Sequence, residues 1–243
     1  MPGIMRQWSD KAMEILGLIP ARGESKGIPH KNLKLLCGKP LIAYTIEQAR
    51  KSECLTRLVV STDDEHIADI AEQYGAQVPF IRPKELALDN TLSIDVVLHA
   101  IEWLNENEGY SPDIIMLLQP TSPFRSARDI DNAVAVYAER RPLSLVSICI
   151  ADDNPYWMMS IEGGVLTPLM GHIDHTRRQD IPKAYKLNGA IYIASPEVLC
   201  ERRTFFTEYT IPYIMPRERS LDIDDMLDFH IAEYLLKGGI VQC

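Results

Sequence analysis

The stretch ILGLIPARGESKGIPHKN, residues 15–32, decides the fold class, because a short apolar run passes directly into a loop of glycine and basic residues. Residues 15–20 end at a proline and are too few for an independent helix, so they predict a buried strand. Residues 40–52 then space their apolar side chains as a helix does, with Pro40 in the permitted first turn. Residues 57–62, RLVVST, predict a second strand. The chain therefore starts with a strand, a helix and a strand.

The same alternation continues along most of the chain. Further strands are expected at 77–82, 113–119 and 145–151, and further helices at 64–74, 93–109 and 127–140. Apolar strands separated by helices are typical of an α/β fold, with a mainly parallel sheet covered by helices on both faces. Residues 155–185 interrupt the rhythm with prolines, scattered charges and a Gly163-Gly164 turn, which predicts an inserted hairpin. Regular structure returns at 186–195 and 211–216, and then in a terminal amphipathic helix whose shared face is Leu227, Ile231, Tyr234 and Leu235.

Composition and charge exclude several classes of protein. The 243 residues suit one substantial domain, and 46% hydrophobic with 24% charged residues fits neither a disordered nor a fibrous chain. The longest uncharged runs have about ten residues, short of the roughly 18 to 20 that a membrane span needs. A net charge of -9 argues against general binding to nucleic acid. Residues 1–11 have no apolar core of a secretory signal, so a cytoplasmic protein is expected.

The five cysteines are widely spread and never occur as CxxC, which favours free thiols over a disulfide framework or a zinc site.

The first loop concentrates positive charge where open α/β folds bind ligands, after a strand's carboxyl end. Glycines there would let backbone N–H groups approach phosphate oxygens, so a triphosphate is the expected ligand. The P-loop pattern GxxxxGK[ST] and the dinucleotide pattern GxGxxG are both absent. A solvated basic loop is the alternative. The residues concerned are Arg22, Lys26, Lys31 and Lys34, with Gly23 and Gly27.

Two further polar segments are candidates for the site. One follows a predicted strand, and the other precedes the predicted last helix. QPTSPFR, residues 119–125, is expected to lie beside the first loop, with Gln119 available to a polar ligand; a rigid structural turn is the alternative. In the DID segment, Asp222 and Asp224 point the same way on an extended chain, which suits Mg²⁺ beside a triphosphate. Helix capping by Asp224 is the alternative. The segment DIDDM differs from a haloacid-dehalogenase phosphatase motif at Met226, and no GxSxG or HExxH motif indicates a hydrolase.

Taken together, these segments resemble the CMP-sialic acid synthetase (acylneuraminate cytidylyltransferase) family over residues 15–237. The stretches that carry the resemblance are IPARGESKGIPHKN, VVSTDDEHIADIAEQYGA, IRPKELALD, LLQPTSPFRS, KLNGAIYI and SLDIDDMLDF. The resemblance implies a single domain with a Rossmann-like nucleotidyltransferase fold, an N-terminal extension at 1–14, and a homodimer in which an excursion near 155–185 reaches the partner. It also implies that CMP is transferred from CTP to the anomeric hydroxyl of a nine-carbon acidic sugar, with release of pyrophosphate.

The resemblance assigns roles by motif position. The nucleotide would be held by Arg22, Ser25, Lys31, Asn32 and Arg82, and Mg²⁺ by Asp222 and Asp224. The sugar would be bound by Gln119, Arg178, Gln179, Asn188 and Tyr192, with Phe205 and Phe206 forming an aromatic wall against its acyl-amino group. Catalysis by Arg22, Lys31, Asp222 and Asp224 would consist of positioning and charge neutralisation. The base that deprotonates the sugar stays open between a metal-bound hydroxide and a carboxylate.

One departure from the family pattern leaves the sugar undecided. Many sialic acid synthetases have a basic residue in the segment where this chain has Tyr156 and Trp157. An aromatic pocket would suit a less hydroxylated, more N-acylated sugar such as legionaminic acid, whereas Trp157 packed in a dimer interface is the alternative. N-acetylneuraminic and pseudaminic acids also stay open, as do a CMP-KDO synthetase and a catalytically silent sugar-nucleotide-binding protein.

Overall fold

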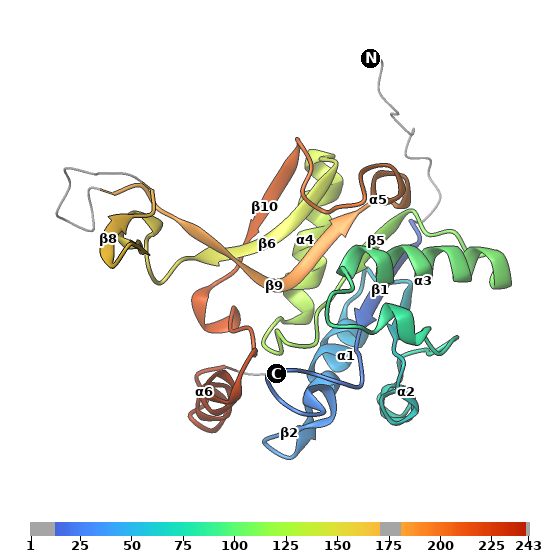
Figure 1. Cartoon of the computed structure of the whole chain (residues 1–243). Coiled ribbons are helices and arrows are strands. Elements are labelled where there is room, and N and C mark those ends of the chain that lie inside the picture. Colours follow the sequence, from blue (N-terminus) through green and yellow to red (C-terminus); the bar gives the residue numbers. More distant parts are fainter. Residues whose placement is uncertain (1–12, 171–180, 242–243) are drawn as a thin grey trace.

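A six-stranded sheet forms the centre of the molecule in the computed structural model, which describes residues 13–170 and 181–241 (Figure 1). The strand order is β10-β6-β9-β5-β1-β4. Only β9 runs antiparallel to its two neighbours, while β1 pairs in parallel with β4 and β5, and β10 pairs in parallel with β6. The mainly parallel sheet is thereby confirmed. Its strands are β1 (Ile15–Pro20), β4 (Arg57–Ser61), β5 (Ile114–Leu117), β6 (Ser144–Ile150), β9 (Tyr185–Ala194) and β10 (Thr210–Ile214).

Helices cover both faces of this sheet, which explains why the strands are apolar throughout. Alternate side chains of β1 pack on opposite faces: Ile15 and Ile19 lie in a core with α1, α2 and α4, and Leu16 and Leu18 in a core with α3 and α5. A third, smaller core joins α6 to the short hairpin β2–β3. The helices are α1 (Leu41–Lys51), α2 (Glu65–Gln73), α3 (Ser93–Glu108), α4 (Ala127–Arg140), α5 (Pro196–Arg202) and α6 (Met226–Lys237); the hairpin pairs β2 (Leu35–Leu36) with β3 (Lys39–Pro40).

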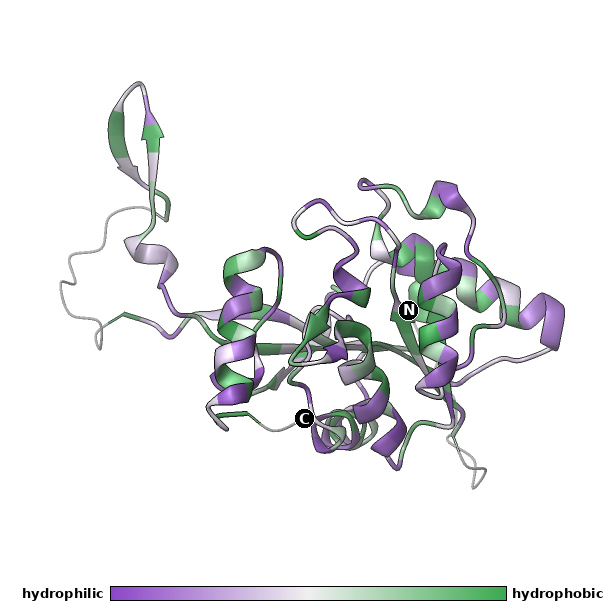
Figure 2. Ribbon diagram, turned by 90° about the horizontal axis from the view of Figure 1, so that it is seen from below, coloured by the Kyte–Doolittle hydropathy of each residue, from purple (hydrophilic) through white to green (hydrophobic). Residues whose placement is uncertain are grey.

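The predicted excursion is a hairpin arm that stands away from the body (Figures 1 and 2). It pairs β7 (Met159–Glu162) with β8 (Val165–Pro168), and Gly163 and Gly164 turn between them at positive φ. Both strands present apolar side chains to solvent: Ile161, Val165 and Leu166 are 75%, 67% and 65% exposed.

Two findings concern the cysteines and the helices of the described residues. Cys37, Cys54, Cys149 and Cys200 are free thiols, as predicted, and Cys243 lies outside the described residues. In the part of the chain that the structure describes, no helix has the length and apolar character needed to span a bilayer.

Three local predictions differ from the structure. The strand expected at 77–82 is reduced to isolated bridges at Gln77 and Ile81, because Pro79 between them has no N–H to continue a ladder. Helix α5 was not expected, although a Ser195 cap followed by proline at the first helical position is a helix-start signal. Helix α6 packs on the body through Phe229 and Ala232, so part of the predicted apolar face, including Leu227, is exposed.

Candidate functional site

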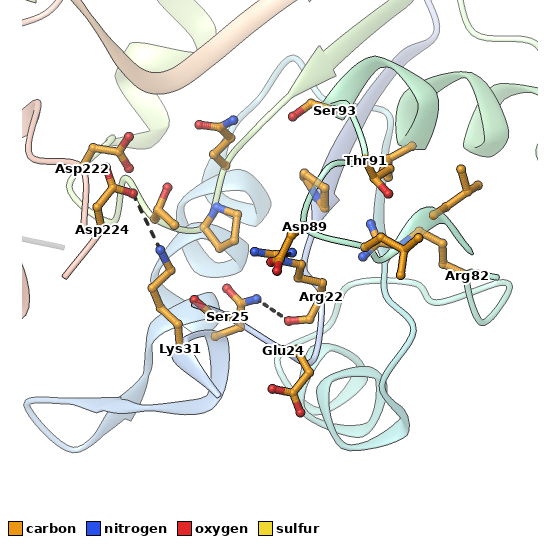
Figure 3. Close-up of a pocket in the computed structure, with 18 residues that line it drawn as sticks. Arg22, Glu24, Ser25, Lys31, Arg82, Asp89, Thr91, Ser93, Asp222 and Asp224 are labelled. Atoms are coloured by element: carbon orange, nitrogen blue, oxygen red, sulfur yellow. Dashed lines mark hydrogen bonds and ion pairs between the residues drawn. The ribbon is translucent and has the colours of Figure 1, made fainter. Parts of the chain in front are cut away.

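A pocket of about 420 Å³ opens where β1 and β5 end side by side (Figure 3). It brings together the first loop, the segment after β5, the DID segment and the segment before α3. The expected proximity of the first two loops is therefore confirmed. The lining residues are Pro20, Arg22, Glu24, Ser25, Lys31, Asn32, Arg82, Leu86, Leu88, Asp89, Thr91, Ser93, Val96, Gln119, Pro120, Thr121, Asp222 and Asp224.

The basic residues of the first loop are already paired with a carboxylate that the sequence reasoning did not single out. Asp89 accepts from Arg22 Nη1 at 2.7 Å, and Lys26 Nζ lies 3.1 Å from its other oxygen. Hydrogen bonds from Lys26 and Arg22 hold the pKa of the Asp89 carboxyl below its usual range. Lys34 does not line the pocket, because its Nζ lies over the ring of Phe229, 5.5 Å from the centroid. An anion in the pocket would therefore compete with Asp89 for two of the cations.

The two glycines of the first loop serve packing between loops. The N–H of Gly23 donates to Asp63 Oδ1 at 3.1 Å, and a Cβ on this glycine would lie 2.7 Å from Asp64 Oδ2. A Cβ on Gly27 would overlap the backbone carbonyl oxygen of Asp224. In this structure, the absence of side chains lets the first loop nest against Asp64 and the DID segment, and Gly23 is not free to donate to a phosphate.

Ile223 fixes the direction of the two carboxylates beside it. Its N–H donates to the carbonyl of Thr121 at 2.9 Å, and its own carbonyl accepts from Lys31 Nζ at 2.7 Å. The Ile223 side chain is fully buried in the third core. Since successive side chains of an extended segment point to opposite sides, Asp222 and Asp224 face the pocket together.

Lys31 is held between this backbone and the carboxylates. Its side chain is 12% exposed, and its Nζ lies 3.9 Å from Asp224 Oδ1. Burial lowers the pKa of Lys31, while the charges of Asp224 and Asp222 act in the opposite direction. The ammonium thus links the first loop to the DID segment at the point where a phosphate would meet a metal.

The donor set at Asp222 and Asp224 fits Mg²⁺ held jointly with a phosphate. Oδ1 of Asp222 is buried and has no hydrogen-bond partner within the described residues, as expected for a carboxylate oxygen awaiting a cation. Burial raises the pKa of Asp222, and a hydrogen bond with Thr121 opposes this. No group of three or more His, Cys, Asp or Glu with metal-binding arrangement occurs within residues 13–170 and 181–241, so phosphate and water oxygens would complete the shell.

The helix-capping alternative for Asp224 is not what the structure shows. Asp225 caps α6, accepting from the N–H groups of Leu227 and Asp228 at 2.8 and 3.1 Å. Asp224 is free of that role, and its side chain is 83% exposed.

Asn32 and Arg82 are buried residues of the pocket wall. Asn32 Nδ2 donates to the carbonyl of Arg22 at 2.9 Å, while its Oδ1 has no partner within the described residues. Arg82 is 3% exposed, and its Nη2 lies 3.4 Å from Asp63 Oδ1. Burial lowers the pKa of Arg82, and Asp63 counteracts it. Both side chains are therefore held in fixed positions.

Of the described residues expected to bind sugar, Gln119 lines this pocket, and Asn188, Tyr192, Phe205 and Phe206 do not. Tyr192 packs against Phe205 and Phe206, with ring centroids 5.6 and 6.4 Å apart, and only Phe206 of these three is exposed. Burial raises the pKa of Tyr192, with a further contribution from the charge of Asp222. Arg178 and Gln179 lie outside the described residues.

The side chain of Asn188 makes its hydrogen bonds inside the protein core. It is 1% exposed; its Oδ1 accepts from Ser147 Oγ at 2.6 Å and its Nδ2 donates to Ser220 Oγ at 3.0 Å. The amide is therefore engaged by the core instead of facing the pocket.

Several pocket residues were missed at the level of sequence. Asp89 and Thr91 come from the segment before α3, Ser93 is the first residue of α3, and Glu24 belongs to the first loop. The stretch IRPKELALD contributed only Arg82 to the expected site, because no local pattern in the sequence connects Asp89 with Arg22, 67 residues away.

Comparison with protein families identifies similar sequences over nearly the whole chain. A family model described as "Cytidylyltransferase" matches residues 16–237. The chain is 40% identical over 228 residues to a CMP-N,N'-diacetyllegionaminic acid synthase of Legionella pneumophila, covering 93% of this chain and 97% of that protein. It is 33% identical to a pseudaminic acid cytidylyltransferase of Campylobacter jejuni, covering 93% and 97%. An N-acylneuraminate cytidylyltransferase of Escherichia coli is 38% identical, with 90% of this chain and 51% of that longer protein covered.

Solved structures share the fold at low sequence identity. A CMP:2-keto-3-deoxy-manno-octonic acid synthetase complexed with CTP matches with a TM-score of 0.70 and 16% identity, covering 93% of this chain and 99% of that one. A 4-diphosphocytidyl-2C-methyl-D-erythritol synthase from Anaerococcus prevotii matches with a TM-score of 0.64 and 12% identity, covering 93% and 100%. These likenesses confirm the predicted nucleotidyltransferase fold.

Proposed function

The chain belongs to the cytidylyltransferase family, and on that premise we propose that it transfers CMP from CTP to the anomeric hydroxyl of a nine-carbon acidic sugar, releasing pyrophosphate. The observation that carries the proposal is one pocket that brings the cations of the first loop together with two carboxylates of the DID segment, with Lys31 beside Asp224. The relatives named for legionaminic, pseudaminic and neuraminic acids support this class of sugar.

In the proposed reaction, the chain positions the substrates and neutralises charge. Arg22, Ser25, Lys31 and Asn32 would hold the triphosphate and ribose, with Asp89 giving up Arg22 as the nucleotide enters. Arg82 would complete the nucleotide site. The sugar hydroxyl forms a bond to the α-phosphorus, and the bond from this phosphorus to the bridging oxygen breaks as pyrophosphate leaves.

Asp222 and Asp224 would hold Mg²⁺, which supplies positive charge to the triphosphate when bound. Lys31 would add a fixed cation on the same side, where charge develops on the leaving pyrophosphate. Gln119, at the end of β5, would hydrogen-bond the sugar. No covalent intermediate with the protein is required.

We propose further that the chain is a single domain that functions as a homodimer through the hairpin arm. The arm exposes apolar side chains on both strands, and the exposed Trp157 lies at its base, away from the pocket lining. A second copy of the chain is the occupant that the proposal requires. Light scattering across a concentration series should give a dimer mass, and Ile161→Asp with Leu166→Asp should shift it toward the monomer.

The reaction is tested by pyrophosphate release from CTP and Mg²⁺ with N-acetylneuraminic, N,N'-diacetyllegionaminic and pseudaminic acids and KDO, comparing kcat/KM. We expect a nonulosonic acid to be the best substrate. Preference for KDO would favour the CMP-KDO synthetase alternative, and silence with all four from folded, CTP-binding protein would favour the silent binder. Asp224→Asn should fold and lose most turnover; near-normal turnover at saturating Mg²⁺ would remove this residue from the metal site.

A further inference from the structure

Strand β9 carries a bulge directly behind the pocket. In its pairing with β6, Val146 stands opposite Tyr192 and Ile148 opposite Leu187, so residues 188–191 of β9 face Ser147 alone. Ser147 closes the bulge from the β6 side: its Oγ donates to Asn188 Oδ1 at 2.6 Å and accepts from the N–H of Ile191 at 2.7 Å. Bulges next to active sites commonly re-aim nearby side chains.

On its other edge, β9 is separated from β5 by a buried arginine. The regular pairing ends at Leu117 with Tyr192, and the same register continued by two residues would bring Gln119 opposite Ala190. Their carbonyl oxygens instead both accept from Arg125 Nη1, at 3.4 and 2.6 Å. Arg125 is 1% exposed, and its Nε and Nη2 have no partner within the described residues. A buried guanidinium with unpaired N–H groups needs an explanation. It is explained if Arg125 keeps the backbones of β5 and β9 apart at Gln119 and Ala190.

The residue at the centre of the bulge is Gly189, with a φ of +69°. A Cβ placed on it would lie 2.7 Å from Gln119 Oε1, 2.9 Å from Ser122 Oγ and 3.0 Å from Asp222 Oδ2. Ser122 Oγ also donates to the carbonyl of Asn188 at 2.8 Å, which ties the turn after β5 to the bulge. The amide expected to contact the sugar and the carboxylate expected to hold Mg²⁺ therefore close around the same glycine.

We propose that Gly189 is a positioning residue for the transfer reaction, and that the bulge around it sets Gln119 and Asp222 side by side. This inference rests on the proposed function, which supplies the reaction. It gives the bulge a role in positioning Gln119 and Asp222, which is separate from the expected binding of sugar by Asn188. Gly189 acts through the two side chains and not by contact with the substrate. Any side chain at this position would push the amide or the carboxylate out of its place.

The variant Gly189→Ala tests the proposal against a matched control, Gly109→Ala. Gly109 ends α3 at a φ of +63°, and a Cβ there meets no atom within 4 Å. Both alanines would have to adopt a positive φ, but only the alanine at residue 189 would contact side chains of the site. We expect Gly189→Ala to lower kcat/KM for the sugar about 100-fold, since misplacing catalytic groups by about 1 Å has effects of that size. Binding of CTP without Mg²⁺ should change less than threefold, and Gly109→Ala should keep wild-type kinetics.

A double-mutant cycle with Gln119→Ala separates positioning from general disruption. With the Gln119 amide removed, one of the oxygens that the added methyl group would meet is gone, so adding Gly189→Ala should cost several-fold less than in the wild type. An equal cost in both backgrounds, or wild-type kcat/KM in Gly189→Ala, would overturn the proposal. If Gly189→Ala does not fold, Arg125→Met applies the same test, because it removes the nitrogen that bonds the carbonyls of both Gln119 and Ala190. Unchanged sugar kinetics in that folded variant would overturn the proposal.

The wild-type protein separates this test from that of the proposed function. Turnover of a nonulosonic acid by the wild type must be established first, and its absence would count against the proposed function. A wild type that is active together with an unaffected Gly189→Ala would count against the positioning role alone.

Discussion

Replacing Lys31 by methionine tests the placement of the cation between the first loop and the DID segment. The Lys31 side chain is 12% exposed, and its ammonium donates to the Ile223 carbonyl at 2.7 Å. Loss of a charged hydrogen bond of this kind costs about 1.5–3 kcal/mol, so we expect the free energy of unfolding to fall by about 2 kcal/mol. The contact with Asp224 adds little to this figure, because that carboxylate is 83% exposed. Urea unfolding followed by circular dichroism measures the change.

The same substitution should strengthen the binding of Mg²⁺ and lower the turnover of CTP. The Nζ atom lies 3.9 Å from Asp224 Oδ1, so its removal relieves repulsion of a cation at the carboxylates. Coulomb's law in a wet site gives about 2 kcal/mol for a unit charge and a divalent ion about 4 Å apart, so nucleotide-free Mg²⁺ should bind up to about 30-fold more tightly. Turnover of CTP should nevertheless fall about 10²- to 10³-fold, because a cation that stabilises the leaving pyrophosphate is lost.

Titration calorimetry with Mg²⁺ and pyrophosphate release together decide the outcome. Weaker Mg²⁺ binding in Lys31→Met would show that the ammonium supports the carboxylates instead of opposing the metal, and the charge reasoning would be wrong. Unchanged turnover would remove Lys31 from the phosphate site. Lys31→Arg is the control that keeps the charge, and it should retain more turnover than Lys31→Met.

Three further substitutions test other contacts of the site and the fold. Gly27→Ala should lower kcat/KM about 100-fold and the free energy of unfolding by about 1–3 kcal/mol, since its Cβ overlaps the Asp224 carbonyl. Gly38→Ala, whose Cβ meets nothing within 4 Å, is the control for kcat/KM alone, because its φ of +85° strains any alanine there. Asp89→Asn should lower the KM for CTP several-fold at low salt and less at high salt, because it frees Arg22 and Lys26; a raised KM would mean that Asp89 orients Arg22. Asp129→Asn should cost about 1.5–3 kcal/mol at pH 7 in urea unfolding, because Asp129 is buried and bonded at 2.8 and 3.0 Å by Arg219, which is itself 33% exposed. Burial alone would raise the pKa of Asp129, but hydrogen bonds from Arg219 and Ser126 outweigh it and the pKa is lowered. The stability it provides is therefore present above its ordinary pKa and is lost as pH falls through the folded value, so the difference from wild type should shrink below about pH 4; a constant difference would contradict this.

The architecture was predictable because its signals are local. Apolar strands between amphipathic segments indicated the mainly parallel sheet, and glycines at 163–164 indicated the hairpin. The strand expected at 77–82 failed where Pro79 interrupts the ladder. The spacing of apolar residues could not predict which side of α6 packs on the body, because the core partners of Phe229 come from distant segments and include Ile28 and Phe124.

The candidate site was predictable where its residues sit at strand ends or on short extended segments. The i and i+2 spacing was sufficient to place Asp222 and Asp224 in one pocket. Asn188 is different, because its partners Ser147 and Ser220 are far away in sequence and occupy an amide that the family resemblance assigned to the sugar. The pairing of Asp89 with Arg22 likewise spans 67 residues. Such contacts depend on the assembled sheet and leave no local pattern.

The central place of β9 has a consequence for how the protein is made. On the ribosome, β5 and β6 are complete before residues 185–194 exist, yet each needs β9 as a neighbour. At about 5–20 residues per second, synthesis of the intervening arm leaves both strand edges unpaired for roughly 2–7 s. Unpaired apolar edges attract other chains, so this interval is when a nascent chain most needs a chaperone. The DID segment emerges later still, so a chain that stops before residue 222 has no carboxylate pair and no complete site.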